Sequence, residues 1–174
     1  MDNVGSALIA QSRSFLVEDY LPKIERCLSL LSDEQIWWRA NSQSNSIGNL
    51  LLHLSGNVGQ WIVAGLGGAG DARDRDAEFS QRDIISRDDL LARLRQTLAE
   101  ADAALAALDP DRLLERFKIQ GLEVTALYAM LHVVEHFSMH TGQIIMMSKA
   151  LGQTDLRFYD FADGKPLLNW RDKR

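Results

Sequence analysis

Apolar residues recur at helical spacing over four long stretches of the chain, which we place at about residues 4–31, 46–66, 86–107 and 125–151. The first of these stretches carries its apolar residues at Leu8, Phe15, Leu16, Leu21, Ile24, Leu28 and Leu31. Breakers separate the stretches: GGAG follows the second, and Asp109-Pro110-Asp111 follows the third. The pattern therefore predicts four long amphipathic helices.

Local signals sharpen several of these boundaries. Ser32 and Gln35 have the spacing of a capping box, which predicts a short extra helix after the first long one. Ser86 and Thr125 are suitable N-terminal caps for the third and fourth helices. Pro22 lies inside the first helix, where it removes a backbone hydrogen bond, so a kink is expected there.

Strand signals are few, which favours an all-α fold. The segment FKIQGLEVT, residues 117–125, reads as extended with a turn around Gly121. Four long helices in a chain of 174 residues predict a single four-helix-bundle domain over residues 1–174. The connection between the second and third helices has about 20 residues, too many for a tight hairpin, so a crossover is expected there.

Composition and charge narrow the class of protein. The net charge of −5 argues against nucleic acid as a partner, since phosphate binding needs a basic face. The one basic run, RDKR at 171–174, reads as a solvated tail. With Cys27 as the single cysteine, no intrachain disulfide or thiolate metal cluster can form. We see no signal peptide and no run of about 18 apolar residues, so we expect a cytoplasmic protein without a membrane partner.

The stretch HVVEHFSMHTGQ, residues 132–143, holds three of the four histidines at intervals of four. On a helix, His132, His136 and His140 therefore share one face, because residues four apart differ by about 40°. The outer two lie roughly 12 Å apart along the axis, so only neighbouring members can share one ion. The candidate ligand pairs are His132 with His136 and His136 with His140. Gln143 lies on the same stripe.

The fourth histidine, His53, lies in SIGNLLLHLSGNVGQW on the second helix. Asn49, Asn57 and Gln60 fall within about 40° of it around the helix. Short amides without lysine or glutamate suggest a polar pocket around a site, although a solvent-facing stripe is the simpler alternative. If His53 faces the pair on the last helix, three nitrogen ligands meet inside the bundle, where such sites are commonly built.

Three histidines with an open position suit zinc, or nickel as another ion that binds imidazole well. The metal would activate a bound water or thiolate, and the sequence identifies no catalytic side chain. The alternative is that these are interior histidines satisfied by hydrogen bonds. A second alternative is the H-x-x-E-H pattern of HVVEH with Glu135 as base, but Glu135 is the last glutamate, which leaves no downstream glutamate ligand.

Three motifs in order, NSIGNLLLHLSGNVGQWI, RDRDAEF and HVVEHFSMHTGQII, resemble the DinB-like superfamily, which includes the YfiT-type metal-dependent hydrolases. The resemblance runs from the helix containing Leu21 to Tyr159. It implies a four-helix bundle with crossover topology, often dimeric. Carried over residue by residue, it implies the ligand set His53, His136 and His140, with Asn49, Asn57, His132 and Gln143 around it. Relatives often have a basic residue where this chain has Thr141.

Characterised relatives include transferases and isomerases that use low-molecular-weight thiols such as bacillithiol or mycothiol. The resemblance thus implies a metal-dependent enzyme that acts on a small molecule by thiol transfer or hydrolysis, and a homodimer. The alternative is a non-enzymatic bundle that binds a metal or ligand.

Overall fold

A computed structural model describes residues 3–152, 155–162 and 164–170, so the basic run at 171–174 lies outside the described residues. The chain is 63% helix and 9% strand, which agrees with the mainly helical content expected from the sequence. Within the described ranges, none of the helices is both long enough and apolar enough to serve as a membrane span.

The first helical segment is continuous but irregular. It consists of α1 (Val4–Ser14), a π-helical stretch η1 (Phe15–Tyr20) and α2 (Leu21–Leu28). The irregular stretch ends just before Pro22, which cannot donate a backbone hydrogen bond, so the disturbance lies where the sequence places it. A short helix α3 (Asp33–Ile36) follows, and Ser32 and Gln35 form both bonds of the expected capping box.

The other long helices begin where their caps predict. Ser46 accepts a hydrogen bond from the backbone of Asn49 at the start of α4 (Ile47–Val58), which continues as the π-helical stretch η2 (Gly59–Ala64). The helix α6 (Arg87–Ala107) begins after its cap Ser86. A short 3-10 turn, η3 (Pro110–Arg112), follows α6, and the last long helix is α7 (Ala126–Gly152).

The extended segment before α7 is a hairpin. Strand β1 (Arg116–Ile119) pairs antiparallel with β2 (Leu122–Thr125), and Ile119 lies opposite Leu122. The two turn residues, Gln120 and Gly121, both have positive φ, which is the conformation of a tight two-residue hairpin turn. The turn predicted around Gly121 is therefore present, as a true pair of strands.

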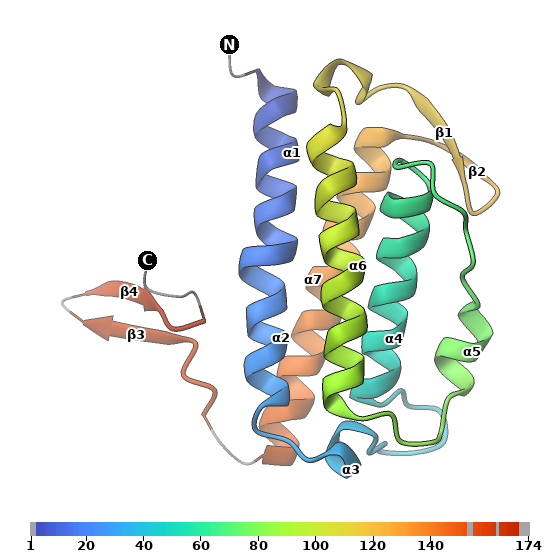
Figure 1. Cartoon of the computed structure of the whole chain (residues 1–174). Coiled ribbons are helices and arrows are strands. Elements are labelled where there is room, and N and C mark those ends of the chain that lie inside the picture. The colour runs from blue at the N-terminus through green and yellow to red at the C-terminus, as the bar shows by residue number, and fades with distance from the viewer. Residues whose placement is uncertain (1–2, 153–154, 163, 171–174) are drawn as a thin grey trace.

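Figure 1 shows the long helical segments side by side, with the connection after η2 returning along the outside of α4 before α6 begins. As a result, α4 and α6 run in the same direction, and α7 packs against α2 and α4. The core between them is apolar, and its largest fully buried side chains include Phe137, Leu28, Leu51, Leu54, Leu94 and Leu98. A short helix, α5 (Arg75–Ser80), lies in the returning connection and packs on α4.

Two short strands also form in the C-terminal region, where the sequence pattern predicts no element. Strands β3 (Tyr159–Ala162) and β4 (Lys165–Leu168) form a second hairpin that projects from the helices (Figure 1). The aromatic residues of this region differ in burial: Trp170 is 8% exposed, with Lys23 over its ring, but Phe161 is 69% exposed. The β-branched and alternating pattern that marks a strand is missing from this segment, which explains the omission.

Close packing in α4 requires a glycine at position 48. A Cβ on Gly48 would lie 2.6–2.9 Å from the buried ring of Trp37. We expect Gly48→Ala to lower the free energy of unfolding by about 1–3 kcal/mol through overpacking. The matched change Gly142→Ala, where nothing lies within 4 Å of the added Cβ, should instead stabilise α7 by about 0.5–1 kcal/mol. Urea unfolding of the two variants without metal measures both changes in the free energy of unfolding. Equal changes would contradict the requirement for glycine at position 48.

Candidate metal centre

Three histidines from two helices meet between α4 and α7. Because Ser46 starts α4, His53 follows two turns later on the side that faces α7, where it is 6% exposed. His136 and His140 lie one turn apart on α7 and are half-buried. Their possible ligand atoms all lie within 4.8 Å of one another.

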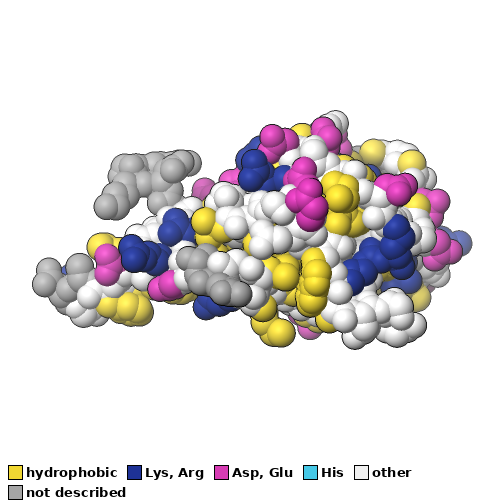
Figure 2. All heavy atoms as spheres, turned by 90° about the horizontal axis from the view of Figure 1, so that it is seen from below, with side chains coloured by type: hydrophobic (Ala, Val, Ile, Leu, Met, Phe, Trp, Pro, Cys, Tyr) yellow, Lys and Arg dark blue, Asp and Glu magenta, His cyan; other side chains and the backbone are white. Residues whose placement is uncertain are grey.

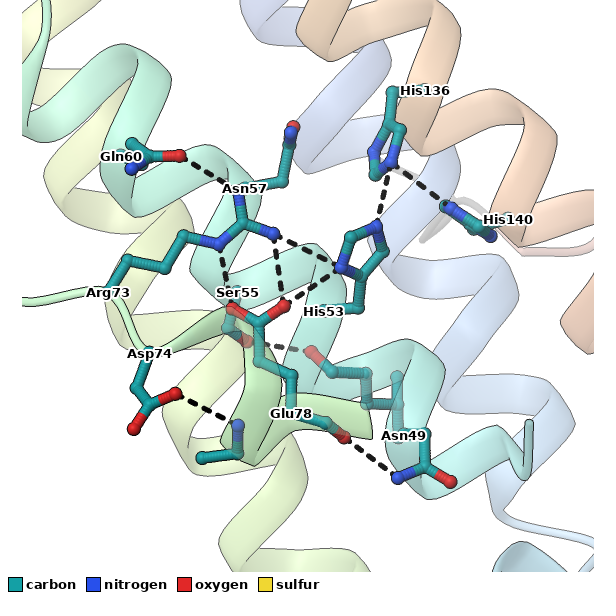
Figure 3. Close-up of polar contacts among 12 residues, drawn as sticks. Asn49, His53, Ser55, Asn57, Gln60, Arg73, Asp74, Glu78, His136 and His140 are labelled. Atoms are coloured by element: carbon teal, nitrogen blue, oxygen red, sulfur yellow. Dashed lines mark hydrogen bonds and ion pairs between the residues drawn. The ribbon is translucent and has the colours of Figure 1, made fainter. Parts of the chain in front are cut away.

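The three side chains converge through the same ring atom. Nε2 of His136 lies 2.9 Å from Nε2 of His53 and 3.1 Å from Nε2 of His140 (Figure 3). Ligands in a tetrahedral zinc site with bonds of 2.0–2.1 Å stand about 3.3–3.4 Å apart, so the nitrogens need to separate by only a few tenths of an ångström.

The opposite ring nitrogens fix the proton positions on two of the rings. Nδ1 of His53 lies 2.9 Å from Oε2 of Glu78, which can only accept, and 3.1 Å from Nη2 of Arg73, which can only donate. Because Nη2 of Arg73 already donates to Oε2 of Glu78, we assign the Nδ1 proton of His53 to the bond with Glu78. Nδ1 of His140 donates to Oε1 of Gln143 at 2.7 Å. Both rings therefore direct an Nε2 lone pair at His136, and a single proton on His136 can satisfy only one of them.

One ring nitrogen of His136 lacks a hydrogen-bond partner in the described part of the chain. Its Nδ1 is buried and has no hydrogen-bond partner among the described residues. Buried polar atoms normally have partners, so this nitrogen is an exception among the polar atoms of the site. Three neutral imidazole nitrogens directed at one point are the donor set that zinc and nickel prefer, so the residues present fit such an ion.

A buried ion pair stands behind His53. Arg73 holds Glu78 through two parallel hydrogen bonds, Nε to Oε1 at 2.8 Å and Nη2 to Oε2 at 3.0 Å (Figure 3). The side chains are 5% and 4% exposed. Arg73 also donates to Oε1 of Gln60, and Gln60 in turn donates to Asp71. A carboxylate that accepts from a ligating imidazole fixes its ring and tautomer, and this one has its own charge balanced by Arg73.

Gly56 makes room for this ion pair. A Cβ at position 56 would overlap the carboxylate of Glu78 and would lie 3.0 Å from Nε of Arg73. The glycine in HLSGN thus lets α5 approach α4 closely enough for Glu78 to reach His53, one turn N-terminal to Gly56.

Burial and mutual proximity keep His136 and His140 neutral. Burial, with added repulsion from His140 and His53, lowers the pKa of His136 to about 3. Burial also lowers the pKa of His140, against an opposing effect of its hydrogen bond to Gln143. Burial alone would raise the pKa of Glu78, but hydrogen bonds from His53 and Arg73 outweigh it and hold that pKa below its usual range. At neutral pH His136 and His140 are thus uncharged, the form that binds metals, and Glu78 is an ionised carboxylate.

The remaining predicted residues take different positions. His132 lies outside the cluster, with its ring 4.2 Å from that of Trp61 and its Nε2 3.4 Å from the amide of Asn57. Gln143 contacts His140 directly. Asn49 does not face the histidines, because it caps α4 and donates to the backbone oxygen of Glu78 at 2.8 Å.

The alternative based on HVVEH finds no support in this geometry. Glu135 is exposed and lines a groove on the outer side of α7 with Tyr20 and Met139. Thr141 is buried and donates to the backbone oxygen of Phe137, so it also points away from the cluster.

Sequence reasoning missed the roles of Arg73 and Glu78. RDRDAEF entered that reasoning as a motif of the family resemblance, whereas Arg73 and Glu78 form a buried ion pair and Glu78 binds His53, which lies 25 residues away. One usable signal existed: HLSGN puts a glycine three residues after His53, where a close approach to the backbone becomes possible.

The fold and site together define a mainly helical protein with a cluster of three histidines able to hold a metal ion. The chain belongs to the family described as Protein of unknown function (DUF1572), whose model matches residues 3–165 and thus covers all three histidines. Among curated proteins, no match to the chain is found.

We expect Glu78→Gln to destabilise the metal-free protein by about 3–5 kcal/mol, because it leaves the guanidinium of Arg73 buried without its counter-charge. The double variant Arg73→Gln/Glu78→Gln should recover much of that loss. A double-mutant cycle with urea unfolding of all four proteins measures the coupling. Additive losses in the double variant would contradict a coupled pair.

The metal-free protein should also lose stability as the pH falls. The folded-state pKa values of His136 and His140 are depressed, so the unfolded chain binds more protons below about pH 6.5. The stabilisation is complete above that pH and, for His136, is lost towards pH 3 by up to about 1.36 kcal/mol per pH unit. His140 contributes a loss in the same direction. Urea unfolding at several pH values should show a shallower slope for His136→Gln than for the wild type.

Proposed function

We propose that this protein is a metal-dependent enzyme of the DinB-like type, a four-helix bundle with a crossover connection between α4 and α6. Three features support the assignment: the mainly helical chain, the connection that returns along α4, and the histidine cluster between α4 and α7. In this proposal the family of the chain is part of the DinB-like superfamily that its motifs resemble.

One observation carries the proposal. With Nδ1 of each ring assigned as a donor to a side-chain oxygen, His53 and His140 both direct an Nε2 lone pair at the Nε2 of His136. Three protein ligands leave a coordination position open, as in catalytic rather than structural zinc sites. A divalent zinc or nickel ion held there would lower the pKa of a water molecule or thiol that binds beside the histidines.

Thiol transfer is the better supported of the two reactions. Hydrolysis is usually assisted by a general base. The two carboxylates nearest to the histidines in the sequence are not available as a base. Glu78 binds His53 and Arg73, and Glu135 lies on the outer side of α7. A low-molecular-weight thiol that loses its proton on binding supplies its own nucleophile. The same observation also leaves open a non-enzymatic module that binds a metal or ligand without turnover.

The partner in either case is a small molecule, because the centre lies in the interior between two helices. We retain the homodimer and the cytoplasmic location as part of the proposal.

The first experiment is metal analysis of the purified protein after expression with added zinc or nickel. We expect one equivalent of metal in the wild type, loss in His140→Ala, and retention in His132→Ala, a matched change on the same face of α7. Metal at about 1,000 times its dissociation constant should raise the free energy of unfolding by about 4 kcal/mol. A wild type without metal, or equal loss in both variants, contradicts the assigned ligands.

The cobalt-substituted protein then separates the two functional classes. A low-molecular-weight thiol should produce a sulfur-to-cobalt charge-transfer band and should be consumed with an electrophilic acceptor. A band without turnover favours the binding module.

A further inference from the structure

Two arginines converge on one backbone oxygen at the end of α5. Nη2 of Arg39 donates to the carbonyl oxygen of Gln81 at 2.7 Å, and Nη1 of Arg82 donates to the same oxygen at 2.9 Å. Asn49 donates to it as well, at 3.2 Å. A single carbonyl dipole thus faces two full positive charges, which it cannot neutralise.

Neither guanidinium has a counter-charge among the residues that the structure describes. Their partners are backbone oxygens and the amide of Asn49, and neither belongs to the salt bridges found within 4.0 Å in the described ranges. Arg39 is half-buried, and its Nε is a buried donor without a partner. Burial, together with repulsion from Arg82, lowers the pKa of Arg39, so the pair is under electrostatic stress.

The surroundings add further positive potential. Arg39 donates to Oδ1 of Asn49, the third residue of α4, so it lies beside the N-terminus of a twelve-residue helix. Helix N-termini carry a partial positive charge. Figure 2 views this end of the molecule and shows Lys and Arg side chains grouped at its surface. Arg82 is exposed, so an anion can reach the pair from solvent.

We propose that Arg39 and Arg82 form an oxyanion-binding site for the phosphate or carboxylate group of a small molecule. Guanidinium groups suit these anions because their planar donors match two oxygens at once. Asn49 connects this site to α5, which carries Glu78, since it contacts Arg39, Gln81 and the backbone of Glu78. This inference rests on the proposed function. It implies that the substrate of the metal centre, or its thiol co-substrate, is an anionic molecule.

The test is calorimetric titration of metal-free wild type with inorganic phosphate and, separately, with malonate at low ionic strength. We expect saturable binding of at least one of them, weakened about tenfold or more in Arg39→Gln and in Arg82→Gln. Arg93→Gln, which removes an exposed arginine of α6, should leave binding unchanged. Tighter binding of malonate assigns a carboxylate, and tighter binding of phosphate assigns a phosphate group.

Further variants distinguish loss of the anion site from loss of the fold and from failure of the metal proposal. Arg39→Lys keeps the charge and should retain most of the affinity, whereas its thermal midpoint reports any structural damage. His140→Ala should bind the anion as the wild type does. Binding that persists in both glutamine variants, or no binding of either anion, overturns the oxyanion site. A wild type without metal that still binds the anion overturns only the metal centre.

Discussion

The hydrogen bond from His53 to Glu78 is the contact on which the candidate site depends. It fixes the proton on the outer nitrogen of the ring and so leaves the inner nitrogen as a lone pair directed at α7. Arg73 keeps the carboxylate ionised in a buried position, and Gly56 gives it access to the helix. Without this arrangement the three histidines would form an ordinary buried cluster that shares protons among its rings.

The helices and their ends were predictable because they depend on local rules. Serine caps at positions 32, 46 and 86 act within one turn, so spacing alone locates them. The histidines that converge were also predictable in part, since helical arithmetic limits α7 to one adjacent pair. Which pair is used depends on the position of α4, which local pattern does not encode; the resemblance to a known family selected His136 with His140.

Arg73 and Glu78 show what the sequence alone could not give. Their segment alternates charges, a pattern that describes a solvated connection as well as it describes a buried ion pair. Only the path of the connection along α4 distinguishes the two, and that path is a property of the whole fold. The second hairpin, β3 with β4, was missed for a different reason, because its segment lacks the alternation by which strands are recognised.

The length of chain between the ligands also bears on the order in which the site assembles. The contact between His53 and Glu78 closes a loop of 25 residues, whereas that between His53 and His136 closes one of 83. Loop-closure entropy makes the shorter loop cheaper by about 1 kcal/mol. Loop closure alone therefore favours organisation of the half of the centre on α4 and α5 before α7 joins it. In that order, α7 brings its two histidines to a ligand that is already oriented.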